Sequence, residues 1–163
     1  MEIQLVNLKR TVKVDDADFF DLNSFEWRGT KDRRGNLYAT TRIGKGKASK
    51  RITMHRFLMN FPDLRVDHID SDGLNNQRKN LRQATASQNT ANAKKHHDGT
   101  LKYKGIHFDE QGRTQNKYRA AICVDGKRIR LGRFPTAIAA ARAYDAAAIF
   151  HFGEFAKPNF PQK

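Results

Sequence analysis

The chain has 163 residues, which is enough for one ordinary domain or two small ones. Its 31 lysines and arginines against 17 acidic residues give a formal net charge of +14, so we expect a polyanionic partner. The sequence shows no long apolar segment, signal peptide or lipidation signal, which favours nucleic acid over a membrane surface as that partner. The single cysteine, Cys123, excludes an internal disulfide and a multi-cysteine zinc site, and it favours a reducing intracellular compartment.

Residues 1–60 are predicted to form antiparallel strands joined by hairpins, because short alternating runs are separated by turn residues. These runs are Ile3–Leu8, Val12–Val14, Leu37–Ile43 and Arg51–Leu58. Trp27 is expected in the core, since a large aromatic side chain among polar residues usually anchors a small sheet. The Gly-Lys loop at 44–47 is either a solvated hairpin tip or a contact to a DNA backbone. We favour the DNA contact, because the glycines let ammonium groups reach phosphates.

The stretch 66–92 gathers metal-binding, proton-accepting and loop-forming residues. Asp67 and His68 lie at the end of a short apolar run typical of a strand, and a polar turn follows. Thr85 and Gln88 have the spacing of a capping box, which predicts the start of a helix. The residues of this stretch that can carry chemistry are, in chain order, Asp67, His68, Asn80 and Asn89.

This order resembles the HNH endonucleases, in the branch where asparagine replaces the last histidine of the motif, as in phage and intron homing endonucleases. The resemblance implies a module of two strands and a helix that grips one divalent ion (the ββα-metal fold). It implies Asp67 and Asn89 as metal ligands, His68 as general base, and Asn80 as the residue that braces the loop behind His68. Adjacent residues of a strand point to opposite faces, so Asp67 and His68 can share a site only if the strand ends or bends there.

The chemistry of phosphodiester hydrolysis accounts for these residue types. It needs a deprotonated water and a Lewis acid that stabilises charge on the phosphate. A neutral imidazole accepts the proton, and a carboxylate with an amide oxygen suffices for Mg²⁺, or for Mn²⁺, because water and phosphate fill the other positions. His55 and Arg56 match the pair that leads into the motif and are assigned a supporting role; His55 is equally well explained as a packed histidine. The nuclease domain is predicted to span residues 1–93.

A second domain, residues 101–163, is predicted after a linker at 94–100. The adjacent His96 and His97 of this linker are assigned no catalytic role. Three strands are expected at Tyr103–Phe108, Lys117–Val124 and Lys127–Phe134, with a two-residue hairpin at 125–126, and a helix capped by Thr136 is expected to run to about Phe150. Alternation places Ile122, Ile129 and Leu131 on the inner face of the sheet, where Ile138, Ala141, Tyr144, Ala148 and Ile149 of the helix cover it. The opposite face is then basic.

Residues 101–160 resemble the plant ethylene-response-factor DNA-binding domain, which also occurs fused to phage HNH nucleases. The residues that carry the resemblance are Tyr103-Lys104-Gly105-Ile106, Tyr118-Arg119-Ala120-Ala121-Ile122, Leu131-Gly132-Arg133-Phe134, Ala143-Tyr144-Asp145 and Phe152-Gly153-Glu154-Phe155-Ala156. The resemblance implies a three-stranded sheet that enters the major groove of DNA. The DNA-contacting residues are then Lys104, Arg119, Arg128, Arg130 and Arg133. A purely solvated basic face is the alternative, and the excess of basic residues favours DNA.

The expected architecture is therefore α+β: a ββα-metal HNH module with N-terminal antiparallel strands, and a small three-stranded antiparallel sheet packed on one helix. The expected function is that of a metal-dependent endonuclease of homing type acting on double-stranded DNA. No membrane and no protein partner is expected, and the expected location is intracellular, in the cytoplasm of a bacterial host if the protein is phage-encoded. The competing hypotheses are a DNA-binding regulator with a catalytically silent HNH fold and an RNA-binding module.

Overall fold

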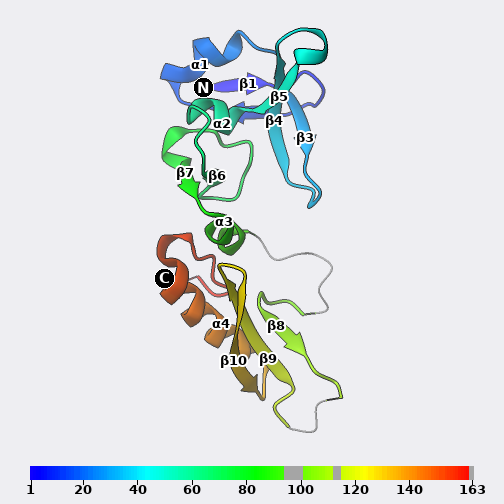
Figure 1. Cartoon of the computed structure of the whole chain (residues 1–163), viewed down its shortest axis with the longest axis vertical. Helices are drawn as coiled ribbons and strands as arrows, with labels where there is room; N and C mark the ends of the chain where they lie inside the picture. Colours follow the sequence, from blue (N-terminus) through cyan, green and yellow to red (C-terminus); the bar gives the residue numbers. More distant parts are fainter. Residues whose placement is uncertain (94–100, 112–114, 162–163) are drawn as a thin grey trace. The chain divides into compact units, whose positions relative to one another are not determined.

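The computed structural model describes residues 1–93, 101–111 and 115–161, and its chain divides into two compact units, Met1–Ala84 and Thr85–Lys163 (Figure 1). Each unit is described by itself. The predicted linker at 94–100 lies outside the described residues. The division falls before the helix of the HNH motif, so this helix is described with the second unit.

The first unit is built from short antiparallel sheets and two short helices. Its elements are β1 (Glu2–Gln4), β2 (Thr11–Lys13), α1 (Asp16–Asn23), β3 (Arg28–Lys31), β4 (Leu37–Ile43), the 3-10 turn Gly46–Ala48, β5 (Lys50–Thr53), α2 (Met54–Leu58), β6 (Arg65–His68), the 3-10 turn Arg78–Asn80 and β7 (Leu81–Ala84). The pairs β1-β2 and β6-β7 are two-stranded, and β3-β4-β5 form a three-stranded sheet. The predicted antiparallel hairpins of the N-terminal region are thus present.

Two predictions for this unit are wrong. The run 51–58 is not one strand, because the chain turns into α2 directly after Thr53. The segment Asp16–Asn23 is helical where no helix was predicted. Acidic side chains in its first turn, Asp16 and Asp18, are favourable beside the positive end of the helix dipole.

The core of the first unit is centred on Trp27, as predicted. This side chain is completely buried, and its indole Nε1 donates a hydrogen bond of 2.8 Å to the carbonyl of Leu22. Side chains from β1, β2, α1, β4, β5, α2, β6 and β7 complete the same apolar cluster: Ile3, Val12, Leu22, Ala39, Ile52, Met54, Leu58, Val66 and Leu81. The motif strands are therefore fastened to a core made by the preceding residues.

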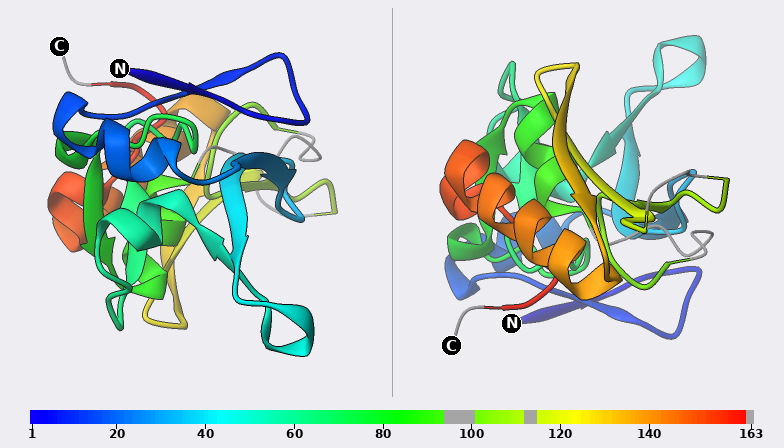
Figure 2. Two further views of the ribbon diagram at one scale, coloured as in Figure 1. Left: turned by 90° about the horizontal axis from the view of Figure 1, so that it is seen from above. Right: turned by 90° about the horizontal axis from the view of Figure 1, so that it is seen from below.

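The second unit packs one long helix on a three-stranded sheet. Its elements are α3 (Ala86–Asn92), β8 (Ile106–Phe108), β9 (Tyr118–Val124), β10 (Lys127–Phe134), α4 (Ala137–Phe152) and the 3-10 turn Gly153–Phe155. The strand order is β10-β9-β8, all antiparallel, and α4 lies along one face of this sheet (Figure 2). Asp125 and Gly126 both have positive φ, 47° and 79°, which is the backbone of the predicted two-residue hairpin.

Helix α4 begins where predicted, since Thr136 Oγ1 accepts a hydrogen bond of 3.1 Å from the backbone of Ala139. Its buried face is made of small side chains and one tyrosine: Ala140, Ala141, Tyr144 and Ala148. Ile129, Ile138 and Ile149, which alternation assigned to the same interior, are exposed. Alanines let the helix approach the sheet closely, and this leaves larger side chains at the rim outside the packed layer.

A bulge in β10 determines which arginines share a face. The register shifts between Arg130 and Gly132, so that Arg130 lies opposite Ala121 and Arg133 lies opposite Arg119. Strict alternation would have placed Gly132, not Arg133, on the same side as Arg130. The bulge therefore brings Arg119, Arg128, Arg130 and Arg133 onto one face.

Candidate active site

Asp67 and His68 are the last two residues of β6, so the strand ends where the sequence argument required it to end or bend. In the antiparallel pair with β7, Asp67 lies opposite Arg82 and His68 lies opposite Leu81. Both acid and imidazole are buried, with exposed fractions of 6% and 5%. A buried Asp-His pair at a strand end is unlike the solvated surface hydrogen bonding that such residues usually provide.

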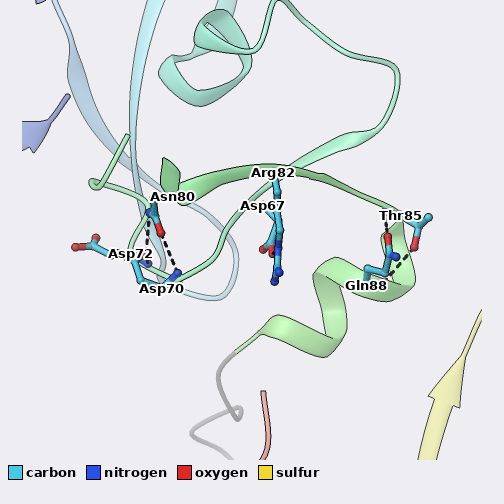
Figure 3. A network of polar contacts seen from close by, with 7 residues as sticks. All are labelled: Asp67, Asp70, Asp72, Asn80, Arg82, Thr85 and Gln88. Carbon is cyan, nitrogen blue, oxygen red and sulfur yellow. Dashed lines mark hydrogen bonds and ion pairs between the residues drawn. The ribbon is translucent and has the colours of Figure 1, made fainter. Parts of the chain in front are cut away.

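The loop after His68 is tied together by Asn80 (Figure 3). Its side-chain Nδ2 donates to Oδ1 of Asp70 at 2.9 Å and to the carbonyl of Asn75 at 2.8 Å, while its Oδ1 accepts from the backbone of Asp70 at 3.1 Å. Its own carbonyl accepts from the backbone of Ile69 at 2.9 Å. Asn80, at the end of the loop, is thus hydrogen-bonded to Ile69 and Asp70 at the start of the loop. A bracing role requires this geometry.

His68 is surrounded by aromatic and amide side chains. The ring of His55 lies 5.0 Å from it, edge to face, and the ring of Tyr38 lies 5.9 Å away. Nε2 of His68 lies 3.4 Å from Oδ1 of Asn76, which is completely buried. Neither Tyr38 nor Asn76 was predicted at the site: Asn76 lies in the polar turn expected after His68, and nothing in the sequence places Tyr38 near the motif.

Burial keeps both histidines neutral. It lowers the pKa of His55 to about 3, and the neighbouring charges of His68 and Arg56 act in the same direction. It also lowers the pKa of His68, against the opposing effects of the hydrogen bond to Asn76 and of nearby carboxylates such as Asp70. An imidazole that is uncharged at neutral pH can accept a proton, and His68 meets this requirement.

The supporting pair His55-Arg56 has a defined structural role. Nε2 of His55 lies 3.1 Å from Oγ1 of Thr53 at the end of β5. The guanidinium of Arg56 donates to the carbonyls of Pro62, at 2.8 Å, and Leu64, at 3.3 Å. Arg56 therefore holds the segment that leads into β6.

The carboxylate of Asp67 is paired with Arg82, whose Nε lies 3.1 Å from Oδ2 (Figure 3). Both side chains are largely buried. In the part of the chain that the structure describes, no group of three or more His, Cys, Asp or Glu side chains is placed to hold a metal ion. The oxygen donors available in the motif, one carboxylate and amide groups, fit a hard cation that keeps water and phosphate in its shell, and they do not fit a zinc cage.

Helix α3 carries Asn89 and begins with the predicted capping box: Thr85 Oγ1 accepts from the backbone of Gln88 at 3.2 Å, and Gln88 Oε1 accepts from that of Thr85 at 2.8 Å (Figure 3). Asn89 itself is half-buried. Within the second unit, the helix is held by Ser87 Oγ, which accepts from the backbone of Asp125 at 2.9 Å, and by packing of Ala91 in the apolar cluster beneath α4.

Lys104 also holds α3, and for this reason it is a poor candidate for DNA contact. Its Nζ donates to the carbonyls of Ala91 at 2.7 Å, Ala93 at 2.9 Å and Lys157 at 3.3 Å. Burial lowers its pKa to about 8. An ammonium that serves as a cap for backbone carbonyls has no donor left for a phosphate, so Lys104 is removed from the predicted set.

The other four predicted contacts lie together on the outer face of the β8-β9-β10 sheet. Arg133 and Arg119 both approach Oδ2 of Asp109, at 2.9 Å and 3.6 Å. Arg128 and Arg130 are exposed and make no ion pair within the described residues. The positive charge of this face is therefore concentrated on Arg128 and Arg130.

Strand, loop, strand and capped helix follow one another as the HNH class of nucleases would require, with Asp67-His68 at the end of the first strand and Asn80 at the base of the loop. No protein-family model matches the chain. The chain is 34% identical, over 116 residues, to a protein of Acanthamoeba polyphaga mimivirus described as "Uncharacterized HNH endonuclease L560". The similarity covers 67% of this chain and 58% of that protein, so the chain matches little more than half of the relative's length. None of the helices in the described residues is long and apolar enough to cross a membrane.

Proposed function

We propose that this protein is a metal-dependent HNH endonuclease that hydrolyses phosphodiester bonds of double-stranded DNA, with His68 as general base. The observation that carries the proposal is the environment of His68, a buried imidazole held neutral beside Asp67 at the end of β6. The sequence similarity to a protein described as an HNH endonuclease supports the same class, and the net charge of +14 suits a polyanionic substrate.

The hydrogen bonds of Asn76 indicate which nitrogen of His68 accepts the proton. Asn76 Nδ2 donates to the carbonyl of Gly73 at 3.3 Å, which turns its Oδ1 toward His68. An amide oxygen can only accept, so Nε2 of His68 carries the hydrogen and the lone pair lies on Nδ1. We assign Nδ1 as the atom that takes the proton from the attacking water. Asn80 keeps the following loop, and with it the imidazole, in place.

Asp67 and Asn89 are the proposed ligands of one divalent ion, Mg²⁺ or Mn²⁺. When bound, the ion would act as a Lewis acid that stabilises negative charge on the phosphate and on the leaving oxygen. Arg82 orients the carboxylate of Asp67 through their 3.1 Å contact.

We further propose homing-type action, in which the sheet of the second unit selects the DNA site through Arg128 and Arg130, with Arg119 and Arg133 beside them. The shared face and the exposure of Arg128 and Arg130 support this assignment. A second candidate is a DNA-binding regulator whose HNH fold is silent. The pairing of Asp67 with Arg82 favours it, because a carboxylate engaged by a guanidinium is less available to a metal ion.

Incubation of supercoiled plasmid with the protein distinguishes these candidates. With Mg²⁺ or Mn²⁺ we expect nicked or linear product, and with EDTA we expect intact plasmid. Intact plasmid in every metal, together with a clear shift in mobility, would contradict the nuclease proposal and favour the regulator.

A further inference from the structure

An open hollow of about 450 Å³ lies over the β3-β4-β5 sheet of the first unit. Its lining includes three arginines, one from each strand of the sheet: Arg28 of β3, Arg42 of β4 and Arg51 of β5. Threonines of the same strands line the hollow, and Glu26 is its acidic residue. We call this hollow, with Arg28, Arg42 and Arg51, the arginine groove.

The strand register explains why the three arginines share one face. Arg42 lies directly opposite Arg51, and Arg28 lies opposite Thr40, which is two residues before Arg42. Directly paired residues and residues two apart point to the same side of a sheet. The other face carries Ala39 and Ile52, which are buried in the core. The sheet therefore has one apolar face on the core and one basic face toward solvent.

Among the described residues, these arginines have no acidic partner in an ion pair. All three are exposed, and none makes an ion pair within the described residues, although Glu26 lines the same hollow. Arg78 in the same unit, by contrast, is paired with Asp18 at 2.7 Å. The direct opposition of Arg42 and Arg51 is itself unfavourable, because like charges facing each other across two strands repel. A bound anion would remove this repulsion.

Strand β4 contributes residues both to the arginine groove and to the surroundings of His68. Tyr38, Thr40 and Arg42 alternate on the same face of this strand, and the ring of Tyr38 lies 5.9 Å from that of His68. Four residues of a strand extend about 13 Å, which matches the axial rise of roughly four nucleotides of duplex DNA. A nucleic-acid backbone that passes His68 can thus reach Arg42 a few phosphates away.

We propose that the arginine groove binds the phosphodiester backbone of duplex DNA a few nucleotides from the phosphate at His68. The choice of substrate rests on the proposed nuclease function. Guanidinium groups suit this task because each presents paired donors to phosphate oxygens. The arginine groove would give the first unit a DNA-binding surface of its own, in addition to the proposed DNA-binding sheet of the second unit.

The test is the salt dependence of binding to a fluorescent DNA duplex, measured by anisotropy in EDTA with the full-length chain. The double variant Arg42→Gln/Arg51→Gln removes the two opposed charges. The variant Lys9→Gln/Arg10→Gln is the matched control, because it removes two exposed charges from the loop between β1 and β2. Thermal melting of both variants shows whether folding is intact, and relief of the repulsion predicts no loss of stability for the groove variant.

For the groove variant we expect roughly tenfold weaker binding or more, and a plot of log K against log salt whose slope is less steep by about 1.8. The control should keep the wild-type slope. Equal slopes for the groove variant and the control would overturn the proposal. So would a duplex RNA of matched length that competes for the groove better than DNA does.

The same proteins distinguish this proposal from the nuclease assignment. The groove variant could show a less steep salt slope while the wild type leaves plasmid intact in every metal. This pair of results would support DNA binding by the arginine groove and contradict the proposed nuclease function. Metal-dependent cutting by the wild type with an unchanged slope in the groove variant contradicts only the groove.

Discussion

The replacement His55→Gln tests the electrostatics around the candidate base. His55 is packed against His68 and Tyr38, with Nε2 at 3.1 Å from Thr53 Oγ1. Glutamine retains a polar nitrogen or oxygen near that position and cannot become charged. The substitution therefore removes the titration of His55 and preserves its polarity.

The expected effect follows from the difference between the folded and unfolded states. The pKa of His55 is about 3 in the folded protein, against an ordinary value of 6.5. Above pH 6.5 His55 is neutral in both states and contributes no pH dependence to the free energy of unfolding. As the pH falls from 6.5 toward 3, only the unfolded chain takes up the proton, so stability is lost. The loss is about 1.4 kcal/mol per pH unit, or roughly 2 kcal/mol between pH 6.5 and about pH 5.

Urea unfolding in EDTA, followed by the fluorescence of Trp27, measures this loss. Trp27 is the single tryptophan and is completely buried in the first unit, so its emission reports unfolding of that unit. We expect the free energy of unfolding of His55→Gln to fall less steeply with acid than that of the wild type, by close to one proton. The variant His151→Gln, at an exposed position of α4, is the control and should show the wild-type dependence. An unchanged acid dependence in His55→Gln would show that burial does not hold His55 neutral.

Two further predictions concern the second unit. Gly105 has a φ of 72°, and a Cβ there would collide with the ring of Tyr144, so Gly105→Ala should destabilise the unit by about 2 kcal/mol or more; an unchanged thermal melt followed by circular dichroism would contradict this. Asp145 accepts hydrogen bonds from the backbones of Asn159, at 2.8 Å, and Phe160, at 2.9 Å. Asp145→Ala should therefore lower stability by roughly 2 kcal/mol and speed hydrogen exchange at the amides of Asn159 and Phe160. Unchanged protection of these two amides would show that the carboxylate of Asp145 does not hold this segment in place.

The parts of the fold that could be predicted from sequence depend on residues close together in the chain. The capping box of Thr85 and Gln88, the cap at Thr136 and the hairpin at 125–126 each involve a few adjacent residues with specific backbone requirements. The strand before the polar turn was predicted, but its end at His68 was only a requirement of the proposed site, which the sequence could not show to be met. Helix α2 was missed because the alternation of β5 continues in sequence past Thr53, where the chain already becomes helical.

The surroundings of the site depend on contacts between distant residues. Tyr38 and His55 reach His68 only because β4, α2 and β6 pack on one core. The opposition of Arg42 and Arg51 depends on strand register, and a shift by one residue would send one of them to the other face. The bulge in β10 was likewise invisible to strict alternation. These features come from packing, which residue periodicity does not specify.

Cutting and binding of the same DNA, compared between the wild type, His68→Ala and His151→Ala, decide whether His68 is the base. We expect His68→Ala to bind the duplex nearly as tightly as the wild type does and to produce no nicked or linear plasmid with Mg²⁺ or Mn²⁺. The control His151→Ala should cut as the wild type does. Undiminished cutting by a folded His68→Ala protein would contradict the assignment of His68 as the base, and with it the proposed active site.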